Sequence, residues 1–232
     1  MHDFSAFEKK LGITFNNKDL LTQAFLHRSF LNENRDVAMG HNERLEFLGD
    51  AVLELVTTEF LYAKYPKNPE GELTAYRAAL VNTQSISDAS LALGMNDYLL
   101  LSRGEEKDVG RARQYILANT FESFIGALYL DQGYDAAKQF IAKYLLPKID
   151  DIVRKRLWQD SKSFFQEKAQ EVWSQTPTYS VIAEVGPDHD KEFEVMVKIG
   201  GDVKATGKGF SKQEAEQDAA RKALEENGWV EK

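Results

Sequence analysis

A run of carboxylates in the stretch HNERLEFLGDAVLELV, residues 41–56, has the composition of a metal-binding helix. Glu43, Glu46, Asp50 and Glu54 stand at i, i+3, i+7 and i+11. A helix of about 3.6 residues per turn places all of them along one face, and a solvated face would interleave lysine or arginine because neighbouring acids repel. Mg²⁺ prefers oxygen ligands and is usually held by one or two carboxylates with water and substrate phosphate. The stretch therefore predicts a magnesium-binding helix; the alternative is an acidic face without a ligand.

The same stretch carries the apolar residues that would pack this helix into a core. The side of the helix opposite the carboxylates is apolar and wide enough to pack against other helices. The residues of that side are Leu45, Leu48, Val52, Leu55 and Val56.

A second helix, predicted from Gln114 to Asp131, places Asn119 and Glu122 one turn apart and facing the same way. An amide oxygen can ligate Mg²⁺ but brings no negative charge. A site that contains Asn119 should therefore bind the metal less tightly than one with a carboxylate at that position.

Two motifs resemble those of a known family. The segment from Asn42 to Asp50, NERLEFLGD, resembles the signature of the ribonuclease III family, nucleases that cut double-stranded RNA. Residues 116–131, ILANTFESFIGALYLD, resemble that family's second active-site helix, with Asn119 where the family usually has Asp. The resemblance implies an all-α nuclease domain that uses Mg²⁺, with Mn²⁺ able to substitute. The implied metal ligands are Glu46, Asp50, Asn119 and Glu122.

The resemblance also implies roles for residues outside that ligand set. Glu43 would support substrate or neighbouring groups, whereas Glu54 matches no family motif and is expected to be a solvated acid. Glu70, just before Gly71, falls where the family has an acid in its cleavage region; the alternative is a solvated turn residue. Phe47 would insert into the partner subunit of a homodimer, and the alternative is an ordinary core aromatic.

The rest of the first domain, residues 1–157, is expected to be helical. Helical periodicity covers residues 3–12, 17–31, 72–93 and 135–157, the last interrupted near Pro147. Prolines and a glycine make residues 65–71 a turn, and residues 102–113 read as a charged loop. His27 is expected to be a core or helix-end histidine held by a hydrogen bond, in preference to a metal ligand.

From residue 158 the pattern changes to that of a second domain, residues 158–232. Two helices, 161–173 and 211–227, flank three strands, 177–185, 192–199 and 203–208. The order αβββα resembles the double-stranded RNA-binding domain, which reads the shape of A-form duplexes. The resemblance implies RNA contacts from Gln166, Glu167, His189, Lys208 and Lys212. Acidic residues follow Lys212 where such domains usually add lysines, so weak binding with shallow salt dependence is expected.

Composition agrees with two domains and sets a constraint on RNA binding. With 232 residues, 43% of them hydrophobic, the chain can bury one good core and a smaller second one, and the absence of cysteine excludes disulfides and thiolate metal sites. No apolar run of about 18 residues and no signal-peptide pattern are present, so a cytoplasmic protein is expected. Residues 1–156 hold 19 basic and 22 acidic residues (−3), and residues 157–232 hold 10 and 15 (−5). Contacts with RNA must therefore come from local basic clusters and metal ions.

Together, the two resemblances imply a Mg²⁺-dependent endoribonuclease that cuts both strands of double-stranded RNA as a homodimer, in rRNA and mRNA processing. No membrane and no small-molecule cofactor are expected. The alternative is a double-stranded RNA-binding protein that keeps the fold but cuts poorly, because Asn119 replaces the usual Asp. A helical scaffold without a role in RNA binding would leave the second domain unexplained.

Overall fold

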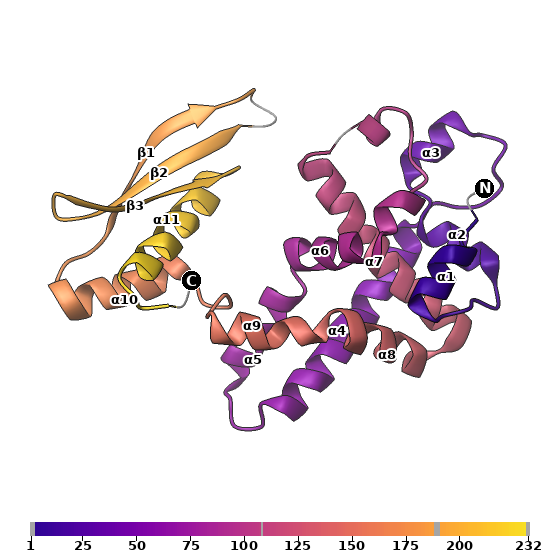
Figure 1. The fold of residues 1–232 in the computed structure, drawn as a ribbon, viewed down its shortest axis with the longest axis horizontal. Coiled ribbons are helices and arrows are strands. Elements are labelled where there is room, and N and C mark those ends of the chain that lie inside the picture. The colour runs from indigo at the N-terminus through magenta and orange to yellow at the C-terminus, as the bar shows by residue number, and fades with distance from the viewer. Residues whose placement is uncertain (1–2, 108, 188–190, 231–232) are drawn as a thin grey trace. The chain divides into compact units, whose positions relative to one another are not determined.

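The computed structural model describes residues 3–107, 109–187 and 191–230, and the chain divides into two compact units, Met1–Asp150 and Asp151–Lys232 (Figure 1). The described part of the first unit is helical, and the second unit combines helices with a three-stranded sheet. These observations confirm the predicted fold class. The domain boundary predicted between residues 157 and 158 remains a prediction. Within the described ranges, no helix is long and apolar enough to cross a membrane.

The helices of the first unit follow one another with short 3-10 helices between some of them. The α-helices are α1 (Ser5–Leu11), α2 (Lys18–Ala24), α3 (Arg28–Glu33), α4 (Glu43–Lys64), α5 (Glu70–Leu80), α6 (Thr83–Leu93), α7 (Arg111–Gln132) and α8 (Tyr134–Tyr144). A further helix, α9 (Ile149–Arg154), begins in the first unit and ends in the second. The 3-10 helices are η1 (Met95–Tyr98), η2 (Glu105–Lys107) and η3 (Leu146–Lys148). The helix predicted over residues 72–93 is thus two helices, α5 and α6.

The helix predicted over residues 17–31 is also broken, into α2 and α3. Between them, Leu26 pairs with Leu100 in an isolated parallel β-bridge. The backbone N–H of His27 donates to the Leu100 carbonyl oxygen at 3.1 Å, and the Leu100 N–H donates to the Phe25 carbonyl oxygen at 2.9 Å. Backbone groups that bond to this distant segment are not available to continue a helix.

Helices α4 and α7 pack against each other at the centre of the first unit. The buried residues of α4 are Leu45, Gly49, Val52, Leu53, Val56, Thr57 and Leu61. Leu55, expected on the same apolar side, is instead 55% exposed, because the buried stripe is narrower than the apolar stripe of the sequence. Beside the crossing, Phe124 of α7 packs edge-on against Phe7, with 5.8 Å between ring centroids.

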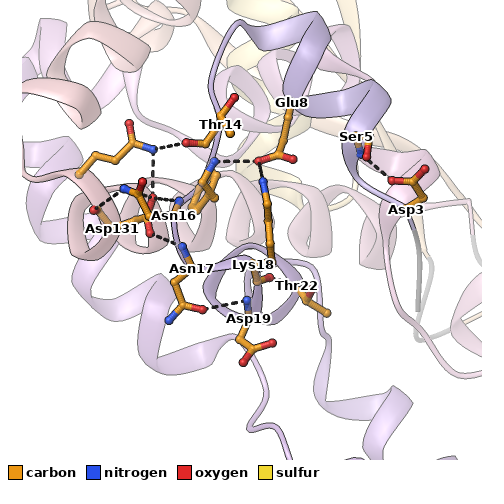
Figure 2. A network of polar contacts seen from close by, with 12 residues as sticks. Asp3, Ser5, Glu8, Thr14, Asn16, Asn17, Lys18, Asp19, Thr22 and Asp131 are labelled. Carbon is orange, nitrogen blue, oxygen red and sulfur yellow. Dashed lines mark hydrogen bonds and ion pairs between the residues drawn. The ribbon is translucent and has the colours of Figure 1, made fainter.

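A network of polar contacts fixes the N-terminal helices to the end of α7 (Figure 2). The Asp131 carboxylate accepts the backbone N–H groups of Asn16 at 2.8 Å and Asn17 at 2.7 Å. Glu8 Oε1 pairs with Lys18 Nζ at 2.5 Å. The loop between α1 and α2 is thereby held against α7.

In the second unit, α10 (Ser161–Trp173) and α11 (Lys212–Glu226) pack on an antiparallel sheet of order β1-β2-β3 (Figure 1). The strands are β1 (Thr178–Val185), β2 (Glu192–Ile199) and β3 (Asp202–Gly209). Phe165, Val197 and Ala219 are among the residues buried between the layers. Gly200, with φ of 60°, supplies the left-handed conformation that the predicted two-residue hairpin turn needs. The order αβββα is confirmed.

Two glycines allow α11 to lie directly on β3. A Cβ on Gly207 would fall 2.1 Å from the backbone nitrogen of Ala219, and a Cβ on Gly209 would fall 2.6 Å from that of Ala215. Neither position has room for a side chain. Lys208, which lies between them, faces the other side of the sheet because successive strand residues alternate.

Candidate active site

Helix α4 presents the predicted carboxylates along one face, and they differ in exposure. Glu43 and Asp50 are exposed, whereas Glu46 and Glu54 are half-buried. Burial first, and then the charge of Glu43, raise the pKa of the Glu46 carboxyl. A hydrogen bond from the Asn119 side chain acts in the opposite direction. Asn119 of α7 therefore lies beside the acids of α4.

The acids of α4 meet those of α7 because the two helices cross in backbone contact. A Cβ on Gly49 would lie 1.8 Å from the carbonyl oxygen of Glu122, and a Cβ on Gly126 would lie 2.2 Å from that of Leu45. Only glycine permits so close an approach at these positions. Because Asp50 follows Gly49 directly, this contact brings Asp50 and Glu122 close together.

The carboxyl group of Glu122 is strongly perturbed by its surroundings. Burial raises its pKa to about 8, with smaller contributions from the charges of three acids of α4. These are Asp50, Glu46 and Glu54. Without a cation, the Glu122 carboxyl is therefore largely protonated at neutral pH. The repulsion between carboxylates packed in this way is relieved when a divalent cation binds.

The donor atoms suit a hard divalent cation. Glu46, Asp50 and Glu122 offer carboxylate oxygens and Asn119 an amide oxygen, which are the ligand types that Mg²⁺ prefers. Among residues 3–107, 109–187 and 191–230, no three acidic or histidine side chains form a ready-made metal cage. Mg²⁺ does not need one, because it keeps several waters and is held by one or two carboxylates together with substrate phosphate. The residues therefore fit a cation that substrate helps to hold.

The expectation that Glu54 is a solvated acid is wrong. Its Oε2 lies 2.9 Å from Nε of Arg77 on α5. Arg77 also donates from Nη1 to Thr58 Oγ1 at 2.9 Å, which fixes the guanidinium against α4. Arg77 thus places a permanent positive charge at one end of the acidic face. The spacing of residues on α4 gave no signal for this ion pair, because Arg77 comes from another helix.

Glu70 is exposed at the first position of α5. Its Oε1 accepts a hydrogen bond from Thr74 Oγ1 at 2.9 Å. The same side chain lines a surface cavity of about 430 Å³, together with Tyr62 and Arg77 among others. The charges that raise the pKa of Glu122 do not include Glu70. Within the described residues of one chain, Glu70 is not part of the acidic group, and its catalytic role remains a prediction.

The start of α4 is fixed by Asn42, whose role was not predicted from the sequence. Asn42 is 3% exposed, its backbone N–H donates to the Leu26 carbonyl oxygen at 2.9 Å, and its Nδ2 donates to that of Ala24 at 3.2 Å. From α7, Ser123 Oγ donates to the Asn42 carbonyl oxygen at 3.3 Å. These bonds join distant segments to the first turn of α4, the turn that carries Glu46.

His27 lies at the N-terminus of α3 and acts as its cap. Its Nδ1 accepts from the Ser29 N–H at 3.3 Å and lies 2.8 Å from Ser29 Oγ. Burial lowers the pKa of the imidazole. The prediction of a helix-end histidine held by a hydrogen bond is confirmed.

Phe47 is 81% exposed although it lies in the middle of the acidic motif of α4. The alternative that it is an ordinary core aromatic is therefore wrong. Leu55 and Tyr62 of the same helix are 55% and 75% exposed. Residues about two turns apart share one side of a helix, so Phe47, Leu55 and Tyr62 form an apolar stripe, here called the α4 stripe.

The residues predicted to contact RNA belong to the second unit. Gln166 and Glu167 are exposed on α10 and line a surface hollow of about 410 Å³. Lys208 lies next to the last residue of β3, and Lys212 is the first residue of α11. His189 lies outside the described residues, so its predicted contact stays a prediction.

Comparisons with known proteins agree with these features. Residues 17–149 match a family model described as ribonuclease-III-like, and residues 161–227 match the model of the double-stranded RNA binding motif. Over 224 residues, 97% of the chain, it is 46% identical to ribonuclease 3 of Bacillus velezensis, of which it covers 90%. It is 48% identical over 222 residues to ribonuclease 3 of Geobacillus kaustophilus, covering 96% of this chain and 90% of that protein.

Solved structures show a similar nuclease domain. The nuclease domain of ribonuclease III from Campylobacter jejuni aligns with a TM-score of 0.57 at 38% identity, covering 62% of this chain and 99% of that chain. A second crystal structure of that domain gives a TM-score of 0.56 at 38% identity, covering 65% and 96%. Both the fold and the sequence of this chain are thus similar to a known nuclease domain.

Proposed function

The chain belongs to the ribonuclease III family, and from this premise we propose that Glu46, Asp50 and Glu122 form its active site. The protein is an endoribonuclease that acts on double-stranded RNA. The observation that carries the proposal is the backbone contact between α4 and α7, which sets Glu122 against the acids of α4. Asn119 completes the group, and Glu43 supports it from the first turn of α4.

Nucleases of this family depend on a divalent metal, and the proposal specifies Mg²⁺, with Mn²⁺ able to replace it. When bound, the cation would lower the pKa of a water and neutralise charge on the scissile phosphate. Glu46, Asp50 and Glu122 would hold it through carboxylate oxygens, and Asn119 through its amide oxygen. The presence of only oxygen donors supports this choice of metal.

The protein's own groups set the conditions for this binding. Glu122 must lose its proton before it can act as a ligand, because its pKa is about 8 in the absence of a cation. Asp50 is exposed and meets solvent and substrate, whereas Glu122 is held in place by its part-buried position. The Arg77 guanidinium pairs with Glu54 and offsets part of the negative charge that an approaching phosphate would meet.

The proposal includes a homodimer in which a partner subunit covers the α4 stripe. One acidic group serves one strand, so cutting both strands of a duplex requires a second group related by symmetry. The 81% exposure of Phe47 supports this arrangement, because a solvated phenylalanine in a helix is costly unless something covers it. The similar Campylobacter jejuni domain has a region described as involved in dimer formation. Phe47 would insert into the partner, and Glu70 would lie in the cleavage region.

The second unit would hold the duplex. Gln166, Glu167 and His189 would contact the minor groove, and Lys208 and Lys212 the phosphates, as in shape-based recognition of A-form RNA. The match to the double-stranded RNA binding motif supports this assignment. Processing of rRNA and mRNA in the cytoplasm, as the sequence predicts, belongs to the same proposal.

The competing hypothesis is a protein that binds double-stranded RNA without cutting it. Only Asn119 favours this hypothesis, and the matches to family models and relatives do not favour it. The test uses duplex RNA and a single strand of the same sequence, each incubated with Mg²⁺, Mn²⁺ or EDTA. We expect both strands of the duplex to be cut with either metal, and neither RNA to be cut with EDTA. Binding of the duplex without cutting in either metal would favour the competing hypothesis.

A further inference from the structure

Carboxylates of the second unit face the lysines that are expected to meet RNA phosphates. Lys212 Nζ lies 3.8 Å from Glu184 Oε1, and Lys208 Nζ lies 3.6 Å from Glu192 Oε2. Glu184 Oε2 also lies 3.6 Å from Lys191 Nζ. In the free protein, both phosphate-binding lysines thus have partners from their own chain.

The strand register explains how Lys212 reaches Glu184. Glu184 of β1, Phe193 of β2 and Gly209 of β3 form one row across the sheet. Lys212 begins α11 three residues after the end of β3, and its Nζ lies over the Phe193 ring, 5.7 Å from the centroid. The ring supports the lysine as it crosses the sheet to the opposite edge strand. This contact is therefore set by the fold of the sheet and not only by two mobile side chains.

Lys208 is also surrounded by acids. Its partner across the strands is Glu194 of β2. Glu192 lies two residues before Glu194 on β2. The Lys208 backbone N–H donates to Asp218 Oδ2 at 2.9 Å. Each carboxylate lowers the positive potential that a phosphate would meet at Lys208.

We propose that Glu184 and Glu192 compete with RNA for Lys212 and Lys208, so that duplex RNA binds only by displacing them. The inference rests on the proposed function, in which these lysines hold phosphates. The two acids then determine how tightly the second unit binds a duplex.

The competition predicts both an affinity and a salt dependence. Exposed ion pairs are individually weak, so neutralising both acids should tighten binding by about tenfold. Cations leave the RNA when lysines neutralise phosphates, and each such contact adds roughly one unit to the log–log salt slope. A carboxylate displaced from its lysine takes up a cation from solution, which cancels part of this release. Neutralising both acids should therefore steepen the slope by up to about two units.

The test measures binding of the full chain to a blunt RNA duplex of about 20 base pairs, longer than the ~16 that such domains span. EDTA is present, and gels confirm that the RNA stays intact. The chain carrying Glu184→Gln and Glu192→Gln is compared with one carrying Asp202→Asn and Glu226→Gln. The control removes the same charge from the other end of the sheet and from the C-terminal end of α11. We expect about tenfold tighter binding in the first and a change within about twofold in the control.

A double-mutant cycle separates competition from net charge. Lys212→Gln should weaken binding more in the Glu184→Gln background than in the unsubstituted chain, because only there is the lysine free to meet phosphate. Equal losses in both backgrounds, or equal tightening by both charge-removing pairs, would overturn the inference while the RNA-binding role stands. If neither the unsubstituted chain nor the Glu184→Gln, Glu192→Gln chain binds duplex RNA, the inference and the RNA-binding role both fail.

Discussion

Gly49 of α4 and Gly126 of α7 face each other where the two helices cross. A Cβ on Gly49 would lie 2.9 Å from the Gly126 nitrogen, and a Cβ on Gly126 would lie 3.1 Å from the Gly49 nitrogen. The acids on either side of this contact are therefore placed by backbone packing. Two residues without side chains determine how close Glu122 comes to Asp50.

Replacing either glycine should separate the helices. For Gly126→Ala we expect a loss of about 1–3 kcal/mol in the free energy of unfolding, because the added methyl group would meet backbone atoms that cannot rotate away. Gly71→Ala is the control, since nothing lies within 4 Å of a Cβ there and alanine favours the helix. Urea denaturation measures both variants. Equal stability of the two would contradict the close crossing.

The Glu122 carboxyl should make stability depend on pH when no cation is bound. Its pKa is raised from 4.5 to about 8 in the folded protein, so protonation favours the folded state. This contribution is complete below about pH 4.5 and is lost as the pH rises through 8. The Glu122→Gln variant should lack this loss, so in EDTA its melting temperature should match that of the unsubstituted chain at about pH 4 and exceed it at about pH 8.5. Parallel pH profiles of the two proteins would show that Glu122 is not perturbed.

Asn119→Asp should tighten cation binding. The new carboxylate would stand beside Glu46, and an added opposite charge at ligand distance should raise the affinity for Mg²⁺ or Mn²⁺ by roughly tenfold or more. In EDTA the same variant should be less stable, because like charges then repel. Calorimetric titration with Mn²⁺ measures the affinity, and Asn227→Asp in the second unit adds the same charge elsewhere. Unchanged affinity in Asn119→Asp would remove position 119 from the cation site.

Phe47→Ala should weaken the homodimer. Burying one phenylalanine side chain is worth about 1.5–3 kcal/mol, and symmetry doubles this to roughly 3–6 kcal/mol for a dimer. Sedimentation over a range of protein concentrations should therefore show the variant as a monomer where the unsubstituted chain is dimeric. Val203→Ala, at a side chain 55% exposed in the second unit, should leave the dimer intact. A dimer of equal strength in Phe47→Ala would exclude the α4 stripe as the interface.

The sequence predicted what depends on local periodicity. The spacing of Glu46 and Asp50 placed both on one helical face, and the change to period-two alternation after residue 158 marked the strands of the second unit. Such patterns can be recognised in the sequence because they repeat within one element. The fold class and the element order of the second unit were predictable for this reason, whereas two helices predicted in the first unit are each broken in two.

Features that join distant segments were not accessible. The helix break at Leu26 depends on its bridge to Leu100, and the ion pair of Glu54 depends on Arg77 from another helix. Hydrophobicity alone does not distinguish a core position from an interface position for Phe47; only the resemblance to the family favoured the interface, and its exposure depends on which side of α4 packs on α7. In each case tertiary packing overrides the local pattern.

Cleavage of a long RNA duplex with Mg²⁺ tests the central claim most directly, with Glu122→Gln beside the unsubstituted chain and Glu226→Gln as the matched control on α11. We expect the unsubstituted chain and the control to cut both strands, and Glu122→Gln to cut at least about a hundredfold more slowly while binding the duplex equally well in EDTA. Cutting by Glu122→Gln at the rate of the unsubstituted chain would contradict an active site built where α4 crosses α7.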